Sequence, residues 1–246
     1  MIWGGDLYSR NLGKKNLKWH ILEFFRRPVI RRIGHLVTYV PGDVELAREW
    51  YGATGKHHDC LMYTSNIYRE HKAITQPHTT INIQIGNSAA PSNNHLEIIE
   101  KLKPFASQDV AIYAPLSYGD DFYARKVIDK GYSIFGEKFK PMTTFLPFDQ
   151  YLDFLGKIDI AIFNHKRQQA MGNTITLLGL GKKIYMRSDI TPWSMFEKLQ
   201  IKVFDVKNIE ISKISETSRA CNIENVRNRF SEPRFLQELN NIFTSK

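Results

Sequence analysis

The chain has 246 residues, of which 42% are hydrophobic and 24% charged, a composition typical of globular proteins that form one large domain or two small ones. No apolar run reaches the ~18 residues of a membrane-spanning helix. The first residues also lack the basic and apolar regions of a secretory signal, so neither feature is expected. The net charge of +9 favours polyanionic partners such as nucleic acid, anionic lipid or phosphorylated substrates. The two cysteines, Cys60 and Cys221, form no paired motif, which predicts reduced thiols in a cytoplasmic protein.

Positive charge is concentrated near the N-terminus. Between Arg10 and Arg32 eight basic residues stand against a single acid, Glu23. Apolar residues recur at helical spacing over 16–33, and Pro28 is expected to bend or split this helix. Two interpretations stay open. The stretch is either a solvated basic face above a core-facing helix or an interfacial helix that lies on an anionic membrane.

The elements that follow this helix are short. A strand is predicted at 35–40, and a helix is predicted from Asp43, as N-cap, to about Trp50. Another strand is predicted at 60–64, before a polar, irregular stretch. On this basis the chain divides into a partial N-terminal domain at 1–70, a connection at 71–80 and a C-terminal domain at 81–246.

From Ile81 onward strands and helices alternate. Strands are predicted at 81–85, 110–114, 158–163, 183–186 and 202–204. Helices are predicted near 93–102, 120–130, 148–155, 173–180 and 193–199. The strands are short, apolar and β-branched, as in parallel sheets that are covered on both faces. This alternation predicts a Rossmann-like, doubly wound α/β sheet, whose ligands collect beyond the carboxyl ends of the strands.

Small polar side chains crowd the loop after the first of these strands, at 86–95. Gly86 frees the backbone, and Ser92 or Asn93 can cap the next helix. The amides at a helix N-terminus form a ready site for a phosphate or diphosphate. A simple turn and cap would use the same residue types, so both interpretations stay open. The candidate ligand-binding residues here are Gly86, Asn87, Ser88, Asn93, Asn94 and His95.

The segment after the strand at 158–163 carries a cation, two amides and a glycine before the next helix. Arg167 can donate two hydrogen bonds to phosphate oxygens. Amide side chains can recognise sugar hydroxyls or an N-acyl group, and Gly172 permits close backbone approach. An all-polar run here gives up the packing of apolar side chains, which favours ligand binding over a purely structural role. The candidates are Arg167, Gln168, Gln169, Gly172 and Asn173.

Two further strand ends carry candidates. Tyr118, in the segment 113–119, can form the wall of a base or sugar pocket. Arg187 follows the strand at 183–186 and precedes a helix that Thr191 would cap with Pro192 at its first position, and simple helix initiation explains those two residues.

Several motifs are absent. The sequence has no Asp-x-Asp pair and no glycine-rich dinucleotide or P-loop motif. His57-His58-Asp59-Cys60 has no second pair of ligands at matching spacing. We therefore expect neither a metal ion nor a cofactor, and expect helix amides with Arg or Lys to neutralise leaving-group charge.

Four segments resemble one family, the bacterial N-acetylfucosaminyltransferases of glycosyltransferase family 56. They are the loop at 86–95, Pro-Phe-Asp-Gln-Tyr-Leu at 147–152, Arg-Gln-Gln-x-x-Gly at 167–172 and Trp-Gly-Gly-Asp-Leu-Tyr at 3–8. The resemblance implies a GT-B architecture, in which two Rossmann-like domains face each other across a cleft. It also implies transfer of 4-acetamido-4,6-dideoxygalactose from a dTDP-sugar to lipid II of enterobacterial common antigen. In the family the Trp-Gly-x-Asp element is internal, so we expect a fragment or a reduced acceptor domain, and residues 1–65 contain too few strands for a covered sheet.

The resemblance implies roles for the candidate residues. All those named after the strands would bind the dTDP-sugar, and Asp6 is the candidate base for the acceptor hydroxyl. The acceptor would be a polyprenyl-diphosphate glycolipid, which places the protein at the cytoplasmic side of the bacterial inner membrane as a peripheral protein. The stretch from Arg10 to Arg32 would contact the anionic inner leaflet.

Other functions remain open at this point. The chain could be a related transferase of O-antigen or capsule synthesis, a sugar-nucleotide-binding remnant without turnover, or a basic nucleic-acid-binding protein. The basic residues are not interleaved with stacking aromatic residues in a known nucleic-acid module, so we expect no nucleic-acid partner.

Overall fold

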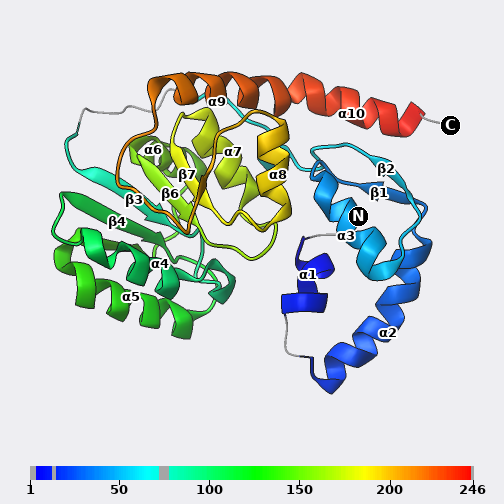
Figure 1. Cartoon of the computed structure of the whole chain (residues 1–246), viewed down its shortest axis with the longest axis horizontal. Coiled ribbons are helices and arrows are strands. Elements are labelled where there is room, and N and C mark those ends of the chain that lie inside the picture. The colour runs from blue at the N-terminus through cyan, green and yellow to red at the C-terminus, as the bar shows by residue number, and fades with distance from the viewer. Residues whose placement is uncertain (1–3, 13–14, 72–77, 245–246) are drawn as a thin grey trace.

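The chain forms two parallel sheets of unequal size (Figure 1). The structure, a computed structural model, describes residues 4–12, 15–71 and 78–244, and the side chains of residues 4–6 lie outside the description. Most of the connection predicted at 71–80 therefore lies outside the described residues. None of the helices in the described part combines the length and the hydropathy needed to cross a membrane.

The larger sheet has six strands in the order β5-β4-β3-β6-β7-β8, and all neighbours run parallel. Its strands are β3 (Ile81–Ile85), β4 (Val110–Pro115), β5 (Phe139–Met142), β6 (Ile160–Phe163), β7 (Lys183–Met186) and β8 (Phe204–Asp205). The chain builds outward from β3 in one direction and from β6 in the other. The boundary between β3 and β6 is therefore the topological switch point, where such sheets bind ligands.

Helices cover both faces of this sheet. Those between the strands are α4 (His95–Leu102), α5 (Asp121–Phe135), α6 (Phe148–Lys157), α7 (Met171–Gly179) and α8 (Thr191–Lys198). Short 3-10 turns lie at η1 (Thr64–Asn66), η2 (Pro91–Asn93), η3 (Lys103–Phe105) and η4 (Gly136–Lys138). One core cluster holds side chains of α4 and α5, and the other holds those of α6, α7 and α8. Figure 1 shows α4 and α5 on one side of the sheet and α6 and α7 on the other.

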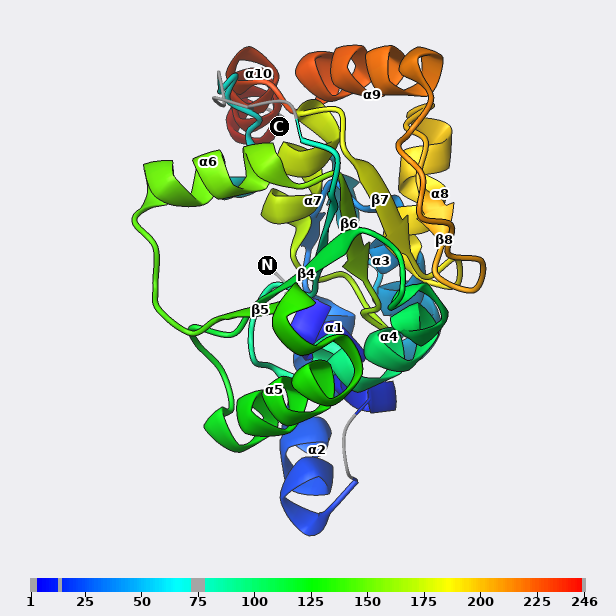
Figure 2. The same ribbon diagram turned by 90° about the vertical axis from the view of Figure 1, so that its left-hand side faces the viewer.

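The smaller sheet belongs to the N-terminal part. It pairs β1 (His35–Val37) with β2 (Lys56–His58), and α3 (Pro41–Tyr51) connects the two strands. Two more helices, α1 (Gly4–Leu12) and α2 (Leu17–Arg32), pack on this unit around a core that includes Leu36 and Tyr51. In Figure 2, α2 extends away from the larger sheet.

The last two helices connect the parts. They are α9 (Glu216–Arg229) and α10 (Glu232–Thr244). The buried carboxylate of Glu238 in α10 accepts a hydrogen bond from the backbone amide of Leu61 at 2.9 Å. It also pairs with Arg229 at 2.7 Å, and that guanidinium reaches Asp59 at 2.8 Å. The C-terminal helix is thereby held against the chain that follows β2.

Several predicted elements differ from the structure. The helix predicted at 16–33 is observed as α2, and it is not split at Pro28. Proline has no amide hydrogen to donate to the carbonyl of Phe24, but Phe24 is exposed, so water can bond to that carbonyl instead. The strand predicted at 60–64 is wrong, because the chain pairs earlier, at β2, and Leu61 is instead buried in the core. The prediction omitted β5, an edge strand that contains Pro141, and it omitted α9 and α10.

The predicted helix starts also need correction. Asp43 is not the N-cap of α3, because that helix begins at Pro41 and its N-cap is Val40. Thr191 is the first residue of α8, after Ile190 as N-cap. The side chains of Asp43 and Thr191 bond to each other at 2.6 Å, so neither side chain is spent on its own helix end.

Candidate functional site

The loops after β3 and β6 meet at the switch point. The side-chain amide of Asn94 donates to the carbonyl of Asn164 at 2.8 Å, and the hydroxyl of Ser92 donates to Oε1 of Gln169 at 2.9 Å. His165 Nε2 lies 2.7 Å from Oδ1 of Asn93, to which it donates. The two loops that the sequence singled out separately thus form one crevice wall.

Asn93 organises the first loop from within. Its Oδ1 accepts from the backbone amide of Asn87 at 3.0 Å as well as from His165. Its Nδ2 donates to the carbonyls of Ser88 and Ala90 at 3.0 and 3.1 Å. Asn93 is fully buried, so each of these bonds replaces one that water would otherwise make. Its role is to hold the turn.

The predicted capping of α4 is a further correction. Neither Ser92 nor Asn93 caps this helix. The N-cap is Asn94, which adopts the left-handed conformation with φ 52° and makes no side-chain cap bond. The side chains of all three residues are used between loops or within the turn, and the first backbone amide of α4, at His95, donates to the hydroxyl of Tyr123 at 3.0 Å.

Gly86 is required at the start of this loop. Its φ is +63°, a conformation that disfavours side chains. A Cβ at this position would lie 2.3 Å from Nε2 of His95 and 2.8 Å from Oδ1 of Asn93. The predicted freedom of the backbone is therefore used for close packing on the histidine.

Two buried histidines lie beneath the crevice. Burial lowers the pKa of His95 to about 4. Burial, with the nearby charge of Arg167 and the ring of His95, lowers the pKa of His165 to about 3. Both imidazoles are therefore neutral at neutral pH, and His165 keeps a proton on Nε2 for Asn93.

Among the described residues, no side chain caps the backbone amides at the start of α7. Its N-cap, Ala170, is in the left-handed conformation and offers no side-chain bond. A helix N-terminus of this kind carries a partial positive charge. Gly172 permits a close approach, as the sequence suggested, but in the structure the neighbour is the backbone of Ser65, whose carbonyl oxygen would lie 2.6 Å from a Cβ.

Arg167 lies at the junction of the two parts of the chain. One nitrogen donates to the carbonyl of Gln168 at 3.1 Å, and the group interacts electrostatically with Tyr8. Burial lowers the pKa of this guanidinium. Among the described residues it makes no hydrogen bond to the loop at 86–95. Its role on a ligand therefore remains a prediction.

The other predicted cation is engaged locally. Arg187 forms a two-point ion pair with Asp189, at 2.8 and 2.6 Å. The hydrogen bonds to Asp189 raise the pKa of Arg187. A ligand at Arg187 would have to share or displace this carboxylate.

Tyr118 borders a cavity of about 340 Å³ beyond the ends of β3, β4 and β5. The amide of Asn87 donates to its hydroxyl at 3.3 Å, and Asn173 also lines the cavity. The structure thus brings together three predicted residues from three segments. We name this cavity the aromatic pocket and define it by Asn87, Tyr118, Phe145, Phe148, Tyr151 and Asn173. Sequence reasoning missed Phe145, Phe148 and Tyr151, although the last two lie in the stretch at 147–152 that carries the family resemblance.

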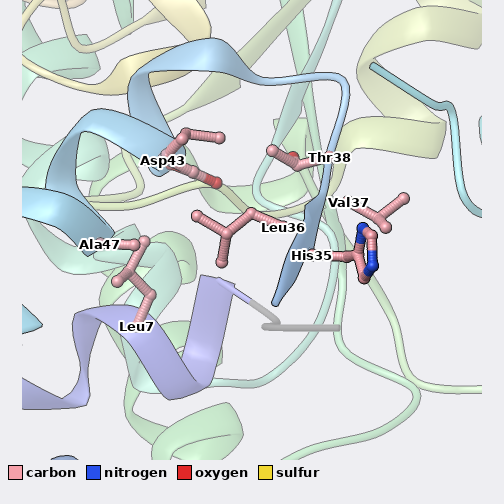
Figure 3. A pocket seen from close by; sticks show the side chains of 8 residues that line it. Leu7, His35, Leu36, Val37, Thr38, Asp43 and Ala47 are labelled. Carbon is pink, nitrogen blue, oxygen red and sulfur yellow. The ribbon is translucent and has the colours of Figure 1, made fainter. Parts of the chain in front are cut away.

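A second polar cluster joins the N-terminal part to α8. Oδ1 of Asp43 accepts from Tyr8 at 3.1 Å and from Thr191 at 2.6 Å. Burial raises the pKa of Asp43 to about 6. Figure 3 shows Asp43 beside a small pocket that Leu7, Leu36 and their neighbours line.

Asp6, the predicted base, lies in α1 next to Leu7, but its side chain is outside the description. Within the described part of the chain, His, Cys, Asp and Glu side chains form no group of three or more that could hold a metal ion.

The whole chain, residues 1–246, matches a family model described as 4-alpha-L-fucosyltransferase, glycosyl transferase group 56. Its fold is similar to that of WaaG, a glycosyltransferase involved in lipopolysaccharide biosynthesis, at 9% identity and a TM-score of 0.65, covering 100% of this chain and 74% of WaaG. It is also similar to sucrose-phosphate synthase from Thermosynechococcus elongatus, at 8% identity and a TM-score of 0.72, covering 98% and 65% of the two chains. Anabaena HepE, in complex with UDP and glucose, matches at 11% identity and a TM-score of 0.71, covering 99% and 71%. These likenesses show the fold, which is the GT-B type. The chain spans about two thirds to three quarters of the length of these structures.

Proposed function

The chain belongs to the 4-alpha-L-fucosyltransferase family, glycosyltransferase group 56, and from this premise we propose that it transfers an N-acetylated deoxyhexose of the N-acetylfucosamine type. The donor is a dTDP-sugar, and the acceptor is a polyprenyl-diphosphate-linked glycan of enterobacterial common antigen or O-antigen synthesis. The observation that carries this proposal is the crevice at the switch point, where the loops after β3 and β6 are joined by three side-chain hydrogen bonds. We place the donor half at 81–246 and the acceptor side at 1–70.

The donor diphosphate lies across this crevice. The uncapped N-terminus of α7 faces its negative charge, and helix N-termini favour such groups. The loop at 87–94 lies beside it with several of its backbone amides already bonded within the protein, as at Asn87, Ala89 and Asn94. Arg167 supplies the cation that neutralises the leaving dTDP, so the proposed reaction needs no metal ion. Gln168, Gln169 and Asn173 lie toward the sugar or ribose.

The acceptor hydroxyl attacks the anomeric carbon of the donor. Its oxygen forms the new glycosidic bond as the bond to the diphosphate oxygen breaks, and dTDP leaves with the electron pair. The proton of the hydroxyl passes to a base, and Asp6 is the proposed base because the family resemblance places it in the motif at the start of α1.

A lipid-linked acceptor requires the protein to work at a membrane surface, which we propose is the cytoplasmic side of the inner membrane. Large apolar side chains of α2 are exposed, among them Leu17, Phe24 and Phe25. Basic residues surround them, and the one acid of this helix, Glu23, is buried and paired with Arg26. Apolar side chains among cations are typical of a helix that binds an anionic bilayer.

The donor assignment is tested by calorimetric titration of dTDP. Loss of a charge-assisted contact at Arg167→Ala should weaken dTDP binding roughly ten- to hundredfold. Arg125→Ala, an exposed arginine on α5, serves as the matched control and should bind as the wild type does. The assignment of Arg167 fails if the two variants bind dTDP equally, and the donor proposal fails if the wild type binds no dTDP.

A binding protein without turnover is the second candidate. It is favoured by the small size of the N-terminal sheet, since two strands provide a limited platform for an acceptor. A transfer assay with dTDP-N-acetylfucosamine and a polyprenyl-diphosphate glycan separates the candidates. Bound dTDP-sugar without product would identify the non-catalytic one.

A further inference from the structure

Three side-chain oxygen atoms from three helices meet where the N-terminal part contacts α8. The hydroxyl of Tyr8 in α1 donates to Oδ1 of Asp43 in α3 at 3.1 Å. The hydroxyl of Thr191, the first residue of α8, donates to the same Oδ1 at 2.6 Å, and the two hydroxyl oxygens lie 2.9 Å apart. We name these three residues the interface cluster. One carboxylate oxygen thereby ties two helices of the acceptor side to the donor half.

The interface cluster is largely shielded from water. Tyr8 and Asp43 are buried, and the ring of Tyr8 packs edge-on against Trp50 with 5.6 Å between the ring centroids. The start of α3 also lies directly on α8, because a Cβ added to Gly42 would lie 2.7 Å from Cγ2 of Thr191. Removing one partner of a buried hydrogen bond leaves the other without compensation for its lost hydration. The geometry of this contact is therefore sensitive to small changes of side chain.

The interface cluster lies close to the proposed diphosphate site. Tyr8 belongs to the segment 3–8 that carries the family resemblance, and it interacts electrostatically with Arg167. Burial raises the pKa of Tyr8, as does the charge of Asp43, so the hydroxyl keeps its proton at neutral pH and remains a donor. Asp43 and Thr191 therefore hold Tyr8 within electrostatic range of the cation that we propose for the donor diphosphate.

We propose that Asp43 and Thr191 are positioning residues of the transfer reaction, which act by holding Tyr8 and α1. Transfer requires the acceptor hydroxyl and the anomeric carbon to meet at about 3–3.5 Å, and a displacement of about 1 Å can cost about a hundredfold in rate. The acceptor side carries one reactant and the donor half carries the other. The interface cluster therefore sets how the two reactants meet.

This inference rests on the proposed function, because it concerns the same transfer, and it gives the two residues a role without contact to either substrate. The kinetic test uses dTDP-N-acetylfucosamine and a polyprenyl-diphosphate glycan. Thr191→Val should lower kcat roughly ten- to hundredfold, because it removes one hydroxyl from the cluster. Binding of dTDP, measured by calorimetry, should stay unchanged. Thr191→Ser keeps the hydroxyl and should restore kcat.

Two further variants sharpen the kinetic test. Gly42→Ala should also lower kcat, because the added Cβ displaces α3 from α8 while all three polar side chains of the cluster stay in place. Tyr185→Phe is the matched control. It loses a buried hydroxyl that bonds to the backbone of Glu210 within the donor half, so it should keep the wild-type kcat.

A distance measurement tests the interface cluster without turnover. Spin labels on Cys221 in α9 and on Glu49→Cys in α3 report on the two parts, because both positions are exposed, whereas Cys60 is buried. By double electron–electron resonance the labelled protein should give one narrow distance distribution. Thr191→Val and Gly42→Ala should each broaden or shift this distribution, and Tyr185→Phe should leave it unchanged.

The outcomes separate the two proposals. Wild-type kcat in both Thr191→Val and Gly42→Ala, or an equal loss of kcat in Thr191→Val and Thr191→Ser, overturns the positioning role and leaves the proposed transfer standing. A parallel loss of dTDP affinity assigns the effect to the donor site and overturns the positioning role too. If the wild type forms no product, the proposed transfer itself fails. A changed label distance in Thr191→Val then still supports the cluster as the contact that sets the two parts, and an unchanged distance overturns it.

Discussion

The larger and the smaller sheet gain their stability in different ways. Strands β6 and β7 are buried along their whole length, between helices on both faces. In the smaller sheet His35 and Lys56 are exposed at the start of their strands. Within the described residues one small core cluster lies in this unit, and Tyr39, Val40 and Leu61 join a core of the larger sheet. The N-terminal part relies in addition on single polar contacts to the rest of the chain, such as Asp43 with Thr191 and Leu61 with Glu238.

This difference shows where polar ligand sites can be placed. A sheet with two complete cores can hold buried polar side chains such as Asn93 and His165 at its end, because apolar burial elsewhere offsets their desolvation. The smaller unit has less apolar burial of its own, although it too buries polar side chains such as Asp43 and His58. Substitutions at the crevice should therefore have large effects on stability, and those on the outer N-terminal surface should have small ones.

The largest effect is expected at Gly86. Gly86→Val should lower the free energy of unfolding by about 3 kcal/mol, because its φ is positive and its side chain would meet His95 and Asn93. Urea denaturation measures this loss. Gly34→Val, next to β1, is the matched control, since a Cβ there has no atom within 4 Å. Equal losses at the two glycines would contradict the proposed difference between the sheets.

The next effect concerns pH and His165. Its folded-state pKa is lowered to about 3, so the unfolded chain binds the proton more readily, and stability is lost as pH falls through the unfolded pKa of about 6.5. Between pH 7 and 5 this group alone should remove about 2 kcal/mol. Over this pH range the free energy of unfolding of His165→Gln should fall by about 2 kcal/mol less than that of the wild type. If the free energy of unfolding falls equally in the two proteins as the pH is lowered, His165 is not held neutral.

Asp43 should show the opposite dependence. Its folded-state pKa is raised to about 6, so the folded protein binds the proton more readily and stability falls as pH rises from the unfolded value to 6. Between pH 5 and 7 the loss should be about 1 kcal/mol. Asp43→Asn should remove it, as measured by urea denaturation across this range. If the free energy of unfolding of Asp43→Asn still falls with pH as that of the wild type does, the carboxylate of Asp43 is exposed to solvent in the wild type.

The smallest effect on stability is expected on the exposed surface of α2. Phe25→Ser should change the free energy of unfolding by less than about 0.5 kcal/mol. It should nevertheless weaken co-sedimentation with phosphatidylglycerol vesicles roughly tenfold, because the variant lacks the aromatic side chain that the bilayer would bury. Phe243→Ser, on the exposed side of α10, is the control and should bind vesicles as the wild type does. Unchanged binding by both variants would remove α2 from the membrane surface.

The fold could be predicted where hydrophobic burial alone decides the structure. The strands at β3, β4, β6 and β7 were found within two residues, because each is rich in apolar residues, continuous in β6 and alternating with polar ones in β3. By contrast β2 has the polar sequence Lys-His-His, and its place is set by pairing with β1. Such pairing depends on the tertiary structure and leaves no pattern in the sequence.

The candidate site could be predicted only in outline. The polar loops at the strand ends were found because the residue types are unusual there, and the topology brings them together. The interior role of Asn93 could not be found, since it depends on His165, 72 residues away. The aromatic pocket was missed because Phe145 lies in the loop after β5, a strand that the prediction omitted.

Hydrogen–deuterium exchange with and without dTDP tests the central claim most directly, because it reports on both sheets at once. The account predicts slower exchange of backbone amides at 86–94 and 168–173 when dTDP is bound, with no change at 35–58. Protection confined to the smaller sheet, or dTDP binding without protection of these two loops, would contradict the placement of the diphosphate at the switch point of the larger sheet.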